Sequence, residues 1–392
     1  MNVLLVVPDW PKPKKLKDPA KYFPYPLLKL AAYHREQGDN VHLHFDDGNV
    51  LYPEKEGNLF LREGIPFVPD LIGITTVFSW WFQDYVKPCI EKYHNLYPAA
   101  TIRIGGVHAS LDPDLYREAF PYADVHIGKL KDAEAVTPAY DLLPSTVRTQ
   151  IDAASSGCIR KCSFCYGWRF GYEEYPWEYF SKRIKMRKLI LNDNNIVARS
   201  DVETFLGNLA DFKLNGKPLS SIEIQGGFDV RILSKKLHLI PLLKACRVTN
   251  IRIAWDGSYD MAPMVDKCVE GLDKQGYNVR NIRCFVLYNH NEPFEIIVRK
   301  LLHLSKLRIG LVHSRFRPIT LLKDGYAPSA KQQTETDYYI HDPLWNDKKI
   351  RIIGSLASDT SKLARSCAKD LDDLRSYYGR PSVQETLQKV AA

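Results

Sequence analysis

Three cysteines on one short segment are the residues whose types and spacing most directly indicate chemistry. Cys158, Cys162 and Cys165 are separated by three and then by two residues within ASSGCIRKCSFCYGW, residues 154–168. Three thiolates on one loop can converge on a single metal centre, and soft sulfur ligands suit zinc or an iron–sulfur cluster. Gly157, directly before the first cysteine, allows the backbone to turn tightly into the loop.

The residues alone leave the kind of metal centre open. A structural zinc site usually needs a fourth protein ligand, and no other cysteine or histidine lies close to these three in the sequence. A cubane cluster held by three cysteines would instead leave one iron open. The remaining cysteines are scattered singly, which is typical of small buried hydrophobic side chains: Cys89, Cys246, Cys268, Cys284 and Cys367.

The cysteine segment resembles the C-x3-C-x-aromatic-C motif of the radical S-adenosylmethionine (radical SAM) enzymes, with Phe164 at the aromatic position. The resemblance implies that the three cysteines hold a [4Fe-4S] cluster whose fourth iron is chelated by SAM. It implies reductive cleavage of SAM to a 5′-deoxyadenosyl radical, with the electron coming from an external donor such as flavodoxin or ferredoxin. It also implies that Phe164 packs near the adenine of SAM.

The elements around this segment alternate between strand and helix patterns. Strands are expected at 149–153, 188–191, 221–224, 250–254, 281–287 and 310–314, and helices at 201–212, 234–245 and 261–275. Such an alternation predicts a parallel sheet, curled as a partial (βα)6 barrel, with the cysteines following its first strand. Helices at 358–378 and 382–391 are expected to form a C-terminal tail.

Further contacts to SAM follow from the resemblance at the ends of these strands. Asn192 and Asp193 follow the second strand, where many members carry Gly-Gly-Glu, and a turn or helix cap is an equal alternative for them. Gln225 and Arg231 follow the third strand. Asp256 follows the fourth, with a helix cap again as the alternative.

The first part of the chain shows a second, separate alternation. Strands at 2–7, 41–46, 71–76 and 101–105, with helices at 26–37 and 79–97, predict a doubly wound, Rossmann-like parallel sheet. Ligands of such sheets bind outside the carboxyl ends of the strands. Residues 129–147 contain proline and are weakly patterned, which indicates a linker.

This first part resembles the cobalamin (B12)-binding domain that precedes the barrel in one radical SAM subgroup. The resemblance implies that loops at the carboxyl edge contact cobalamin through Thr75, Thr76, Ser79, Gly105, Gly106 and His108. The sequence departs from the pattern because it lacks D-x-H-x-x-G, and residues 128–132 (GKLKD) replace the usual acidic turn. Cobalamin-dependent and cobalamin-independent chemistry therefore both remain open.

Composition limits the class of protein and its partners. The 392 residues are 45% hydrophobic and 26% charged, as in ordinary globular proteins, and no apolar run is long enough to span a membrane. No secretion signal is apparent, and we expect a cytoplasmic protein. The net charge of +8 and the basic run 182–188 permit a phosphorylated or nucleic-acid substrate, although a solvated surface is the more usual explanation for such a run.

These observations predict an α/β protein with three parts. Residues 1–140 form a Rossmann-like cobalamin-binding-like domain, residues 141–325 a partial radical SAM barrel, and residues 326–392 a mostly helical extension. The predicted function is a radical SAM enzyme acting on an unactivated C–H bond, with cobalamin-dependent methyl transfer as one form and a cobalamin-independent rearrangement or oxidation as the other. A zinc-clipped nucleic-acid-binding protein without catalysis is the alternative from another class.

Overall fold

The computed structural model describes residues 1–10, 25–46, 64–143, 147–326 and 340–391. Contacts between residues divide the chain into two compact units. The first contains Met1–Asp152, Glu178–Leu189 and Pro318–Asp324, and the second contains Ala153–Trp177, Ile190–Arg317 and Gly325–Ala392. No helix among the described residues has the length and apolar character needed to cross a bilayer.

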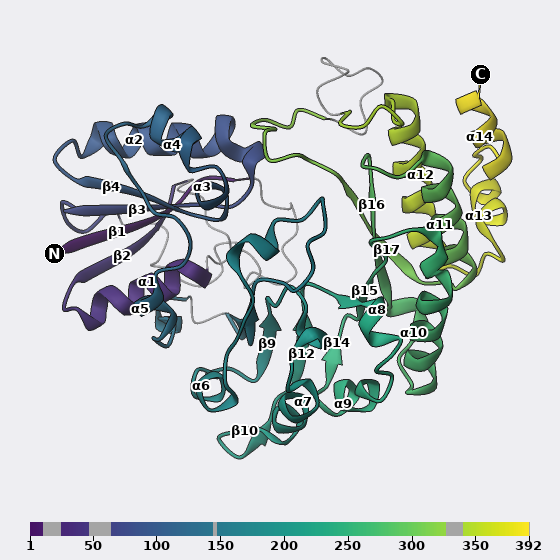
Figure 1. Ribbon diagram of the computed structural model, residues 1–392, viewed down its shortest axis with the longest axis horizontal. Coiled ribbons are helices and arrows are strands. Elements are labelled where there is room, and N and C mark those ends of the chain that lie inside the picture. Colours follow the sequence, from purple (N-terminus) through teal and green to yellow (C-terminus); the bar gives the residue numbers. More distant parts are fainter. Residues whose placement is uncertain (11–24, 47–63, 144–146, 327–339, 392) are drawn as a thin grey trace. The chain divides into compact units, whose positions relative to one another are not determined.

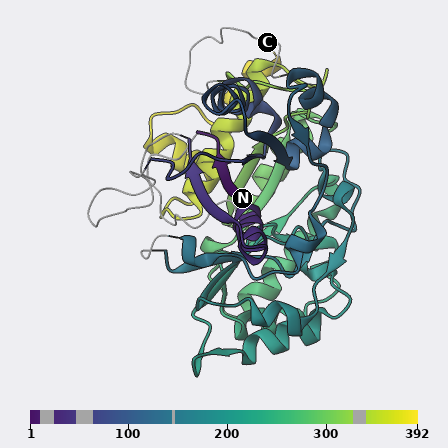
Figure 2. The ribbon, with the colours of Figure 1, turned by 90° about the vertical axis from the view of Figure 1, so that its left-hand side faces the viewer.

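The first unit is a doubly wound parallel sheet, as the sequence predicts. Its strands run in the order β2-β1-β3-β4-β5 and are β1 (Asn2–Val7), β2 (Asn40–Phe45), β3 (Leu71–Thr76), β4 (Thr101–Gly106) and β5 (Asp124–Val125). Helices α1 (Tyr25–Glu36) and α5 (Lys131–Glu134) lie on one face, and α2 (Lys87–Leu96) and α4 (Pro113–Ala119) on the other (Figure 1). Figure 2 looks toward the amino end of β1, with α1 beside this strand.

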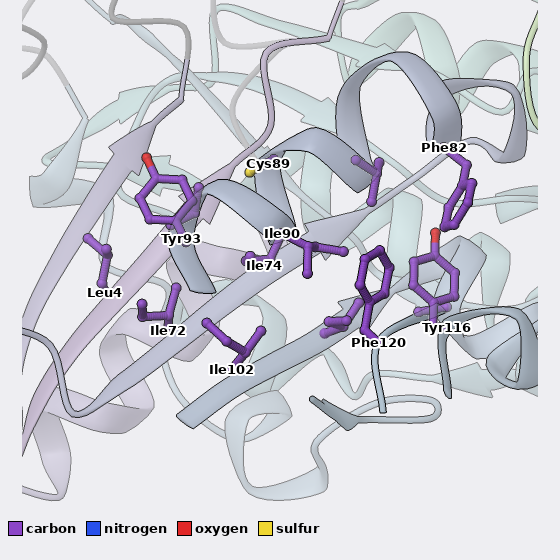
Figure 3. Packing of buried hydrophobic residues seen from close by; sticks show 14 residues of the cluster. Leu4, Ile72, Ile74, Phe82, Cys89, Ile90, Tyr93, Ile102, Tyr116 and Phe120 are labelled. Atoms are coloured by element: carbon purple, nitrogen blue, oxygen red, sulfur yellow. The ribbon is translucent and has the colours of Figure 1, made fainter. Parts of the chain in front are cut away.

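One apolar core joins this sheet to the helices on one of its faces. Strand residues such as Leu4, Ile72 and Ile102 pack against Ile90 and Tyr93 of helix α2 (Figure 3). Burying each such side chain stabilises the fold by about 1.5–3 kcal/mol. Because alternate strand residues face the helices, the core fixes the register of the strands and the level at which their carboxyl ends stop.

Two predictions for this unit are wrong in detail. The predicted helix 79–97 begins as a 3₁₀ turn (Ser79–Trp81) and a π-helical turn (Phe82–Val86), because stacked rings rather than a uniform period organise its start. Trp81 stacks on Trp10 with ring centroids 5.2 Å apart. The predicted linker 129–147 is packed against the unit where it is described, and its buried residues include Val136, Ala139 and Leu143.

Most of the barrel-like strands belong to the second unit. The strands form two four-stranded sheets, β14-β12-β9-β6 and β13-β15-β16-β17, and β6 and the first half of β9 are counted with the first unit. The strands are β6 (Thr149–Asp152), β9 (Lys188–Leu191), β12 (Ser221–Ile224), β13 (Phe228–Asp229), β14 (Val248–Thr249), β15 (Arg252–Ala254), β16 (Arg283–Tyr288) and β17 (Gly310–Arg315).

The two sheets are joined through a bend that the sequence does not predict. Strand β12 pairs with β14 through Glu223 and Thr249, and β13 then pairs with β15 through Phe228 and Ile253. The segment between Glu223 and Phe228 therefore contains one residue more than the segment between Thr249 and Ile253, as in a β-bulge. Gly227 and Asn250, at φ +76° and +53°, turn the two chains there. The predicted third strand, 221–224, is found as β12, and the predicted fourth, 250–254, is found as the shorter β15, whereas the short strands β13 and β14 were not predicted.

The remaining elements surround these strands. Helices α7 (Val202–Asp211), α9 (Leu239–Ala245), α10 (Ala262–Lys274) and α11 (Phe294–Lys306) alternate with the strands along the chain and flank them in Figure 1. Shorter elements are α8 (Val230–Leu233) and the hairpin of β10 (Lys213–Leu214) and β11 (Lys217–Pro218). The first unit also contains α3 (Val107–Leu111) and all but the first residue of α6 (Trp177–Lys182).

The C-terminal tail is helical, as predicted, but its boundaries differ. Helix α12 (Asp347–Leu363) starts earlier than expected and packs on α11 and β17, and α13 (Leu371–Tyr377) and α14 (Val383–Ala391) follow. The buried carboxylate of Asp359 accepts hydrogen bonds from Arg375 at 2.8 Å and from Arg380 at 2.7 Å. This buried charge cluster, which no helical period reveals, fixes where the tail turns.

Two adjacent glycines at the end of β4 give a matched test of this fold. Gly106 has φ +101°, and a Cβ there would overlap the carbonyl oxygen of Thr76 on the neighbouring strand. A Cβ on Gly105 would meet nothing closer than Cβ of His126 at 3.9 Å. We expect Gly106→Ala to lower the free energy of unfolding by about 2–3 kcal/mol, measured by urea denaturation.

The Gly105→Ala protein is the control, and we expect its stability to change by less than about 1 kcal/mol. Equal stabilities of the two variants would show that the close approach of β4 to β3 does not constrain the backbone.

Candidate active site

The three cysteines lie on loop 157–172, whose two ends are held together. Strand β7 (Ser155–Ser156) pairs with β8 (Glu173–Glu174) in an antiparallel ladder. Gly157 enters the loop at φ +71°, and any Cβ there would overlap the carbonyl of Gly171. The sequence expectation of a tight glycine turn is therefore confirmed. All three cysteines are free and half-buried.

A buried carboxylate fixes the base of this loop. Asp193, at the end of β9, accepts hydrogen bonds from the backbone N–H of Ala154 at 3.0 Å and from the hydroxyl of Ser155 at 2.6 Å. Burial raises the pKa of this carboxyl to about 6, although these hydrogen bonds and Arg199 oppose the shift. Asp193 was predicted as a contact to SAM, and in this structure its oxygens are engaged by the loop.

The two asparagines beside Asp193 differ in their contacts to the cysteine loop. Asn194 donates from Nδ2 to the carbonyl of Gly157 at 3.2 Å, whereas Asn192, the residue predicted from sequence, is exposed. Gln225, also predicted, donates to Glu223 at 3.0 Å. Of the two residues for which a turn or helix cap was the alternative, Asp193 holds the base of the loop, a role that local sequence does not indicate.

A second carboxylate holds the loop from the third strand. Asp229, at the end of β13, accepts from Nε of Arg160 at 2.8 Å and from Nε of Arg231 at 2.7 Å. Although burial acts to raise it, these two arginines hold the pKa of Asp229 below its usual value. Arg160 stands between the first two cysteines, so this ion pair ties the cysteine loop to the barrel strand.

Two predicted residues do come to the thiols. The charge of Arg231 acts to lower the pKa of the Cys162 thiol, and the charge of Asp256 acts to raise the pKa of both Cys162 and Cys165. Burial raises the pKa of both thiols, and it also raises the pKa of Asp256 to about 6, against the opposing charge of Arg231. A cation and a half-buried carboxyl group therefore act electrostatically on the same thiol, that of Cys162.

A histidine that the sequence analysis did not single out packs against Ser163 and Phe164 of the cysteine loop. His290, after β16, is 3.0 Å from the hydroxyl of Ser163 and meets the ring of Phe164 edge-on at 6.1 Å. The ring of Phe316 lies 4.2 Å away on its other side. Burial lowers the pKa of His290, which favours its neutral form. Its position after a barrel strand was the only signal in the sequence.

The residues predicted to bind cobalamin lie at the carboxyl edge of the first sheet, but their side chains serve the fold. Thr76 donates to the carbonyl of Gly105 and accepts from the N–H of Ala109, both at 2.9 Å. Ser79 donates to the carbonyl of Pro318. His108 is buried and lies 2.7 Å from the hydroxyl of Tyr116, and burial lowers its pKa to about 4. Thr75 is also buried.

The basic run 182–188 is partly structural. Arg183 is buried and donates to Asp152 at 2.7 Å, within a network that includes Tyr25 and Tyr140. A surface cavity of about 490 Å³ in the first unit is lined by Lys185, Arg35 and Pro138, among others. Because Arg35 already pairs with Asp141 at 2.7 Å, the cavity offers little uncompensated positive charge.

The donor set of loop 157–172 suits an iron–sulfur cluster. Its sulfurs are soft ligands, and the N–H of Arg160 points to the sulfur of Cys158 at 3.4 Å. Among the described residues, no group of three His, Cys, Asp or Glu side chains is gathered as the ligands of one ion. The arrangement offers three thiolates, one cationic donor and one carboxyl group at a single edge of the strands.

Comparisons with known proteins give the fold. No protein-family model and no curated protein matches the sequence. The structure is similar to that of the cobalamin-dependent S-adenosylmethionine radical enzyme OxsB, solved with aqua-cobalamin bound, at a TM-score of 0.53 and 15% identity. The similarity covers 89% of this chain and 56% of OxsB, so the chain spans little more than half the length of that protein.

The cysteine motif, the parallel sheets and this similarity agree. The chain shares the fold of OxsB over most of its length, with a Rossmann-like parallel sheet followed by barrel-like parallel strands and the loop that carries the three cysteines.

Proposed function

We propose that the protein is a radical SAM enzyme that acts on an unactivated C–H bond. The observation that carries the proposal is loop 157–172, which presents Cys158, Cys162 and Cys165 on one segment that Asp193 and Asp229 fasten to the barrel strands. The three cysteines would hold a [4Fe-4S] cluster, which when bound would supply the electron for the reductive cleavage of SAM. OxsB is named as an enzyme of this type, and the shared fold supports the proposal.

The chain's own residues would position the reactants. The three thiolates would hold the cluster, and Phe164, whose ring packs against that of His290, would contact the adenine of SAM. Asp256 forms no hydrogen bond or ion pair within the described part of the chain, so its carboxyl group is available to a polar group of SAM or of the substrate. An external one-electron donor such as flavodoxin or ferredoxin would supply the reducing electron.

We propose further that the first unit binds cobalamin and that the reaction is methyl transfer. OxsB is described with aqua-cobalamin bound. When bound, cobalamin carries the methyl group, and the protein supplies orientation. The strand order β2-β1-β3-β4-β5 places its topological switch point between β1 and β3, where ligands of such sheets bind.

The carboxyl edge of this sheet fits a large ligand with an apolar face. Phe78, Val107 and Ile127 follow β3, β4 and β5, and they remain 40%, 45% and 51% exposed. Three exposed apolar side chains at the ends of neighbouring strands favour contact with a flat macrocycle. The polar side chains predicted for this site are occupied within the fold, so contacts to cobalamin would come mainly from these apolar groups and from the backbone of Gly105.

The first prediction concerns the cluster. Replacing Cys158, Cys162 and Cys165 together by Ala should abolish 5′-deoxyadenosine formation while leaving a folded protein, because the thiolates hold the cluster at the end of already packed strands. Anaerobically reconstituted wild-type protein should contain about four iron and four sulfide per chain. Reduction should give an electron paramagnetic resonance (EPR) signal that changes when SAM is added.

Cys367→Ala is the matched control, because this cysteine is exposed and lies on the C-terminal tail. We expect it to keep the cluster and the activity. Continued 5′-deoxyadenosine formation by the triple variant would overturn the assignment of the site. About one zinc per chain, with no cluster, would favour a metal-clipped binding protein.

The second prediction concerns cobalamin. Val107→Glu should weaken binding of hydroxocobalamin by at least about tenfold, measured by absorbance titration, because it places a charge in an apolar contact. Leu96→Glu is the control: Leu96 is 57% exposed at the end of α2, which leads back to the amino edge of the sheet. Wild-type protein that fails to bind hydroxocobalamin would favour the cobalamin-independent reaction.

A further inference from the structure

The charged residues of loop 157–172 are all basic. The loop contains Arg160, Lys161 and Arg169, and it contains neither aspartate nor glutamate. Arg160 pairs with Asp229 at 2.8 Å, whereas Lys161 and Arg169 are exposed and form no ion pair with the described residues. Two uncompensated cations therefore lie on the surface of the segment that carries the three cysteines.

One indole ring lies within reach of both exposed cations. Nζ of Lys161 is 6.0 Å from the ring centroid of Trp168, and Cζ of Arg169 is 5.6 Å from the same centroid. Trp168 belongs to a 3₁₀ turn that begins at Gly167, where a Cβ would lie 3.3 Å from Nδ2 of Asn194. The turn therefore packs closely on the segment that follows β9. We call the side chains of Lys161, Trp168 and Arg169 the loop patch.

The loop patch has residue types that are typical of a contact with another protein. Arginine and tryptophan are enriched at the positions where protein interfaces bind most strongly. Ile159, two residues before Lys161, adds an apolar side chain that is 49% exposed. Electron-transfer proteins form small, transient complexes, for which a contact of this limited size is sufficient.

The loop patch is also next to the cysteines along the chain. Lys161 directly precedes Cys162, and Trp168 lies three residues after Cys165. A carrier bound there would contact the segment that holds the cluster. One electron would leave the carrier, which is oxidised, and enter the cluster, which is reduced, and no bond in this chain would form or break. An acidic carrier fits two unpaired cations, because opposite charges accelerate and orient the encounter.

We propose that the loop patch is the docking surface for an acidic one-electron carrier protein that reduces the cluster. The proposal rests on the proposed function, because it requires the cluster, and it assigns the surface on which the reductant of that function binds. Lys161 and Arg169 contact the carrier rather than SAM or the substrate. Their replacement therefore slows the arrival of the electron and leaves the cleavage of SAM by a chemically reduced cluster intact.

The experiment follows reduction of the cluster by photoreduced flavodoxin, an acidic carrier, in stopped-flow absorbance with reconstituted full-length protein. We expect Lys161→Glu with Arg169→Glu to lower the second-order rate constant at least about tenfold at low ionic strength, because attraction becomes repulsion. The difference should shrink at high salt, which screens exposed charges. The Kd of oxidised flavodoxin, measured by calorimetry, should rise in the same variant. Lys161→Gln with Arg169→Gln should show a smaller loss of rate.

Lys213→Glu with Lys217→Glu is the matched control. It reverses two exposed lysines on the β10–β11 hairpin, which leads into the amino end of β12, and it should keep the wild-type rate. Excess dithionite should fully reduce the cluster of every variant and support the same 5′-deoxyadenosine formation.

An unchanged flavodoxin rate in both loop variants would overturn the proposal, and so would loss of dithionite-driven 5′-deoxyadenosine formation in both. Loss of binding to a single-stranded oligoribonucleotide, with the flavodoxin rate unchanged, would identify the loop patch as a nucleic-acid contact instead. Wild-type protein that holds no cluster after reconstitution would overturn the proposed function itself.

Discussion

The candidate site depends on side-chain hydrogen bonds that hold the cysteine loop, 157–172, because few backbone hydrogen bonds do so. Loop 157–172 is closed by the short pairing of β7 with β8, and beyond that its place is set by hydrogen bonds to two buried carboxylates. Asp193 holds the base and Asp229 holds the segment between the first two cysteines. Buried carboxylates are costly unless their oxygens are satisfied, so each of these anchors specifies one loop geometry.

The charges of the site follow from those anchors. Asp229 forms ion pairs with two arginines, Arg160 from the loop and Arg231 from the segment after strand β13. Asp256, at the end of the neighbouring strand β15, has a pKa raised to about 6 by burial. Opposite charges at adjacent strand ends give the thiols an uneven electrostatic environment, which is the property that redox chemistry at a metal centre would use.

At the carboxyl edge of the sheet in the first unit, the polar side chains are hydrogen-bonded within the fold and several apolar side chains are exposed. Thr76, Ser79 and His108 lie at or just after the carboxyl ends of β3 and β4, yet their side chains form hydrogen bonds within the first unit itself. The exposed groups there are Phe78, Val107 and Ile127. Backbone N–H and C=O groups at the end of a strand lack partners in the sheet. Polar side chains that could bind a ligand therefore often form hydrogen bonds to these backbone groups instead.

The sequence by itself determined the cysteine motif, the strands around it and the two α/β patterns, because spacing and hydrophobic period are local properties. It did not predict the bend between β12 and β13, the packed segment 129–143, or the start of α12. Only the tertiary structure decided that Asp193 faces the loop, that Asp229 joins Arg160 to Arg231, and that His290 meets Ser163. These pairs are far apart in the chain, and a side chain's hydrogen-bond partner depends on packing that local patterns do not encode.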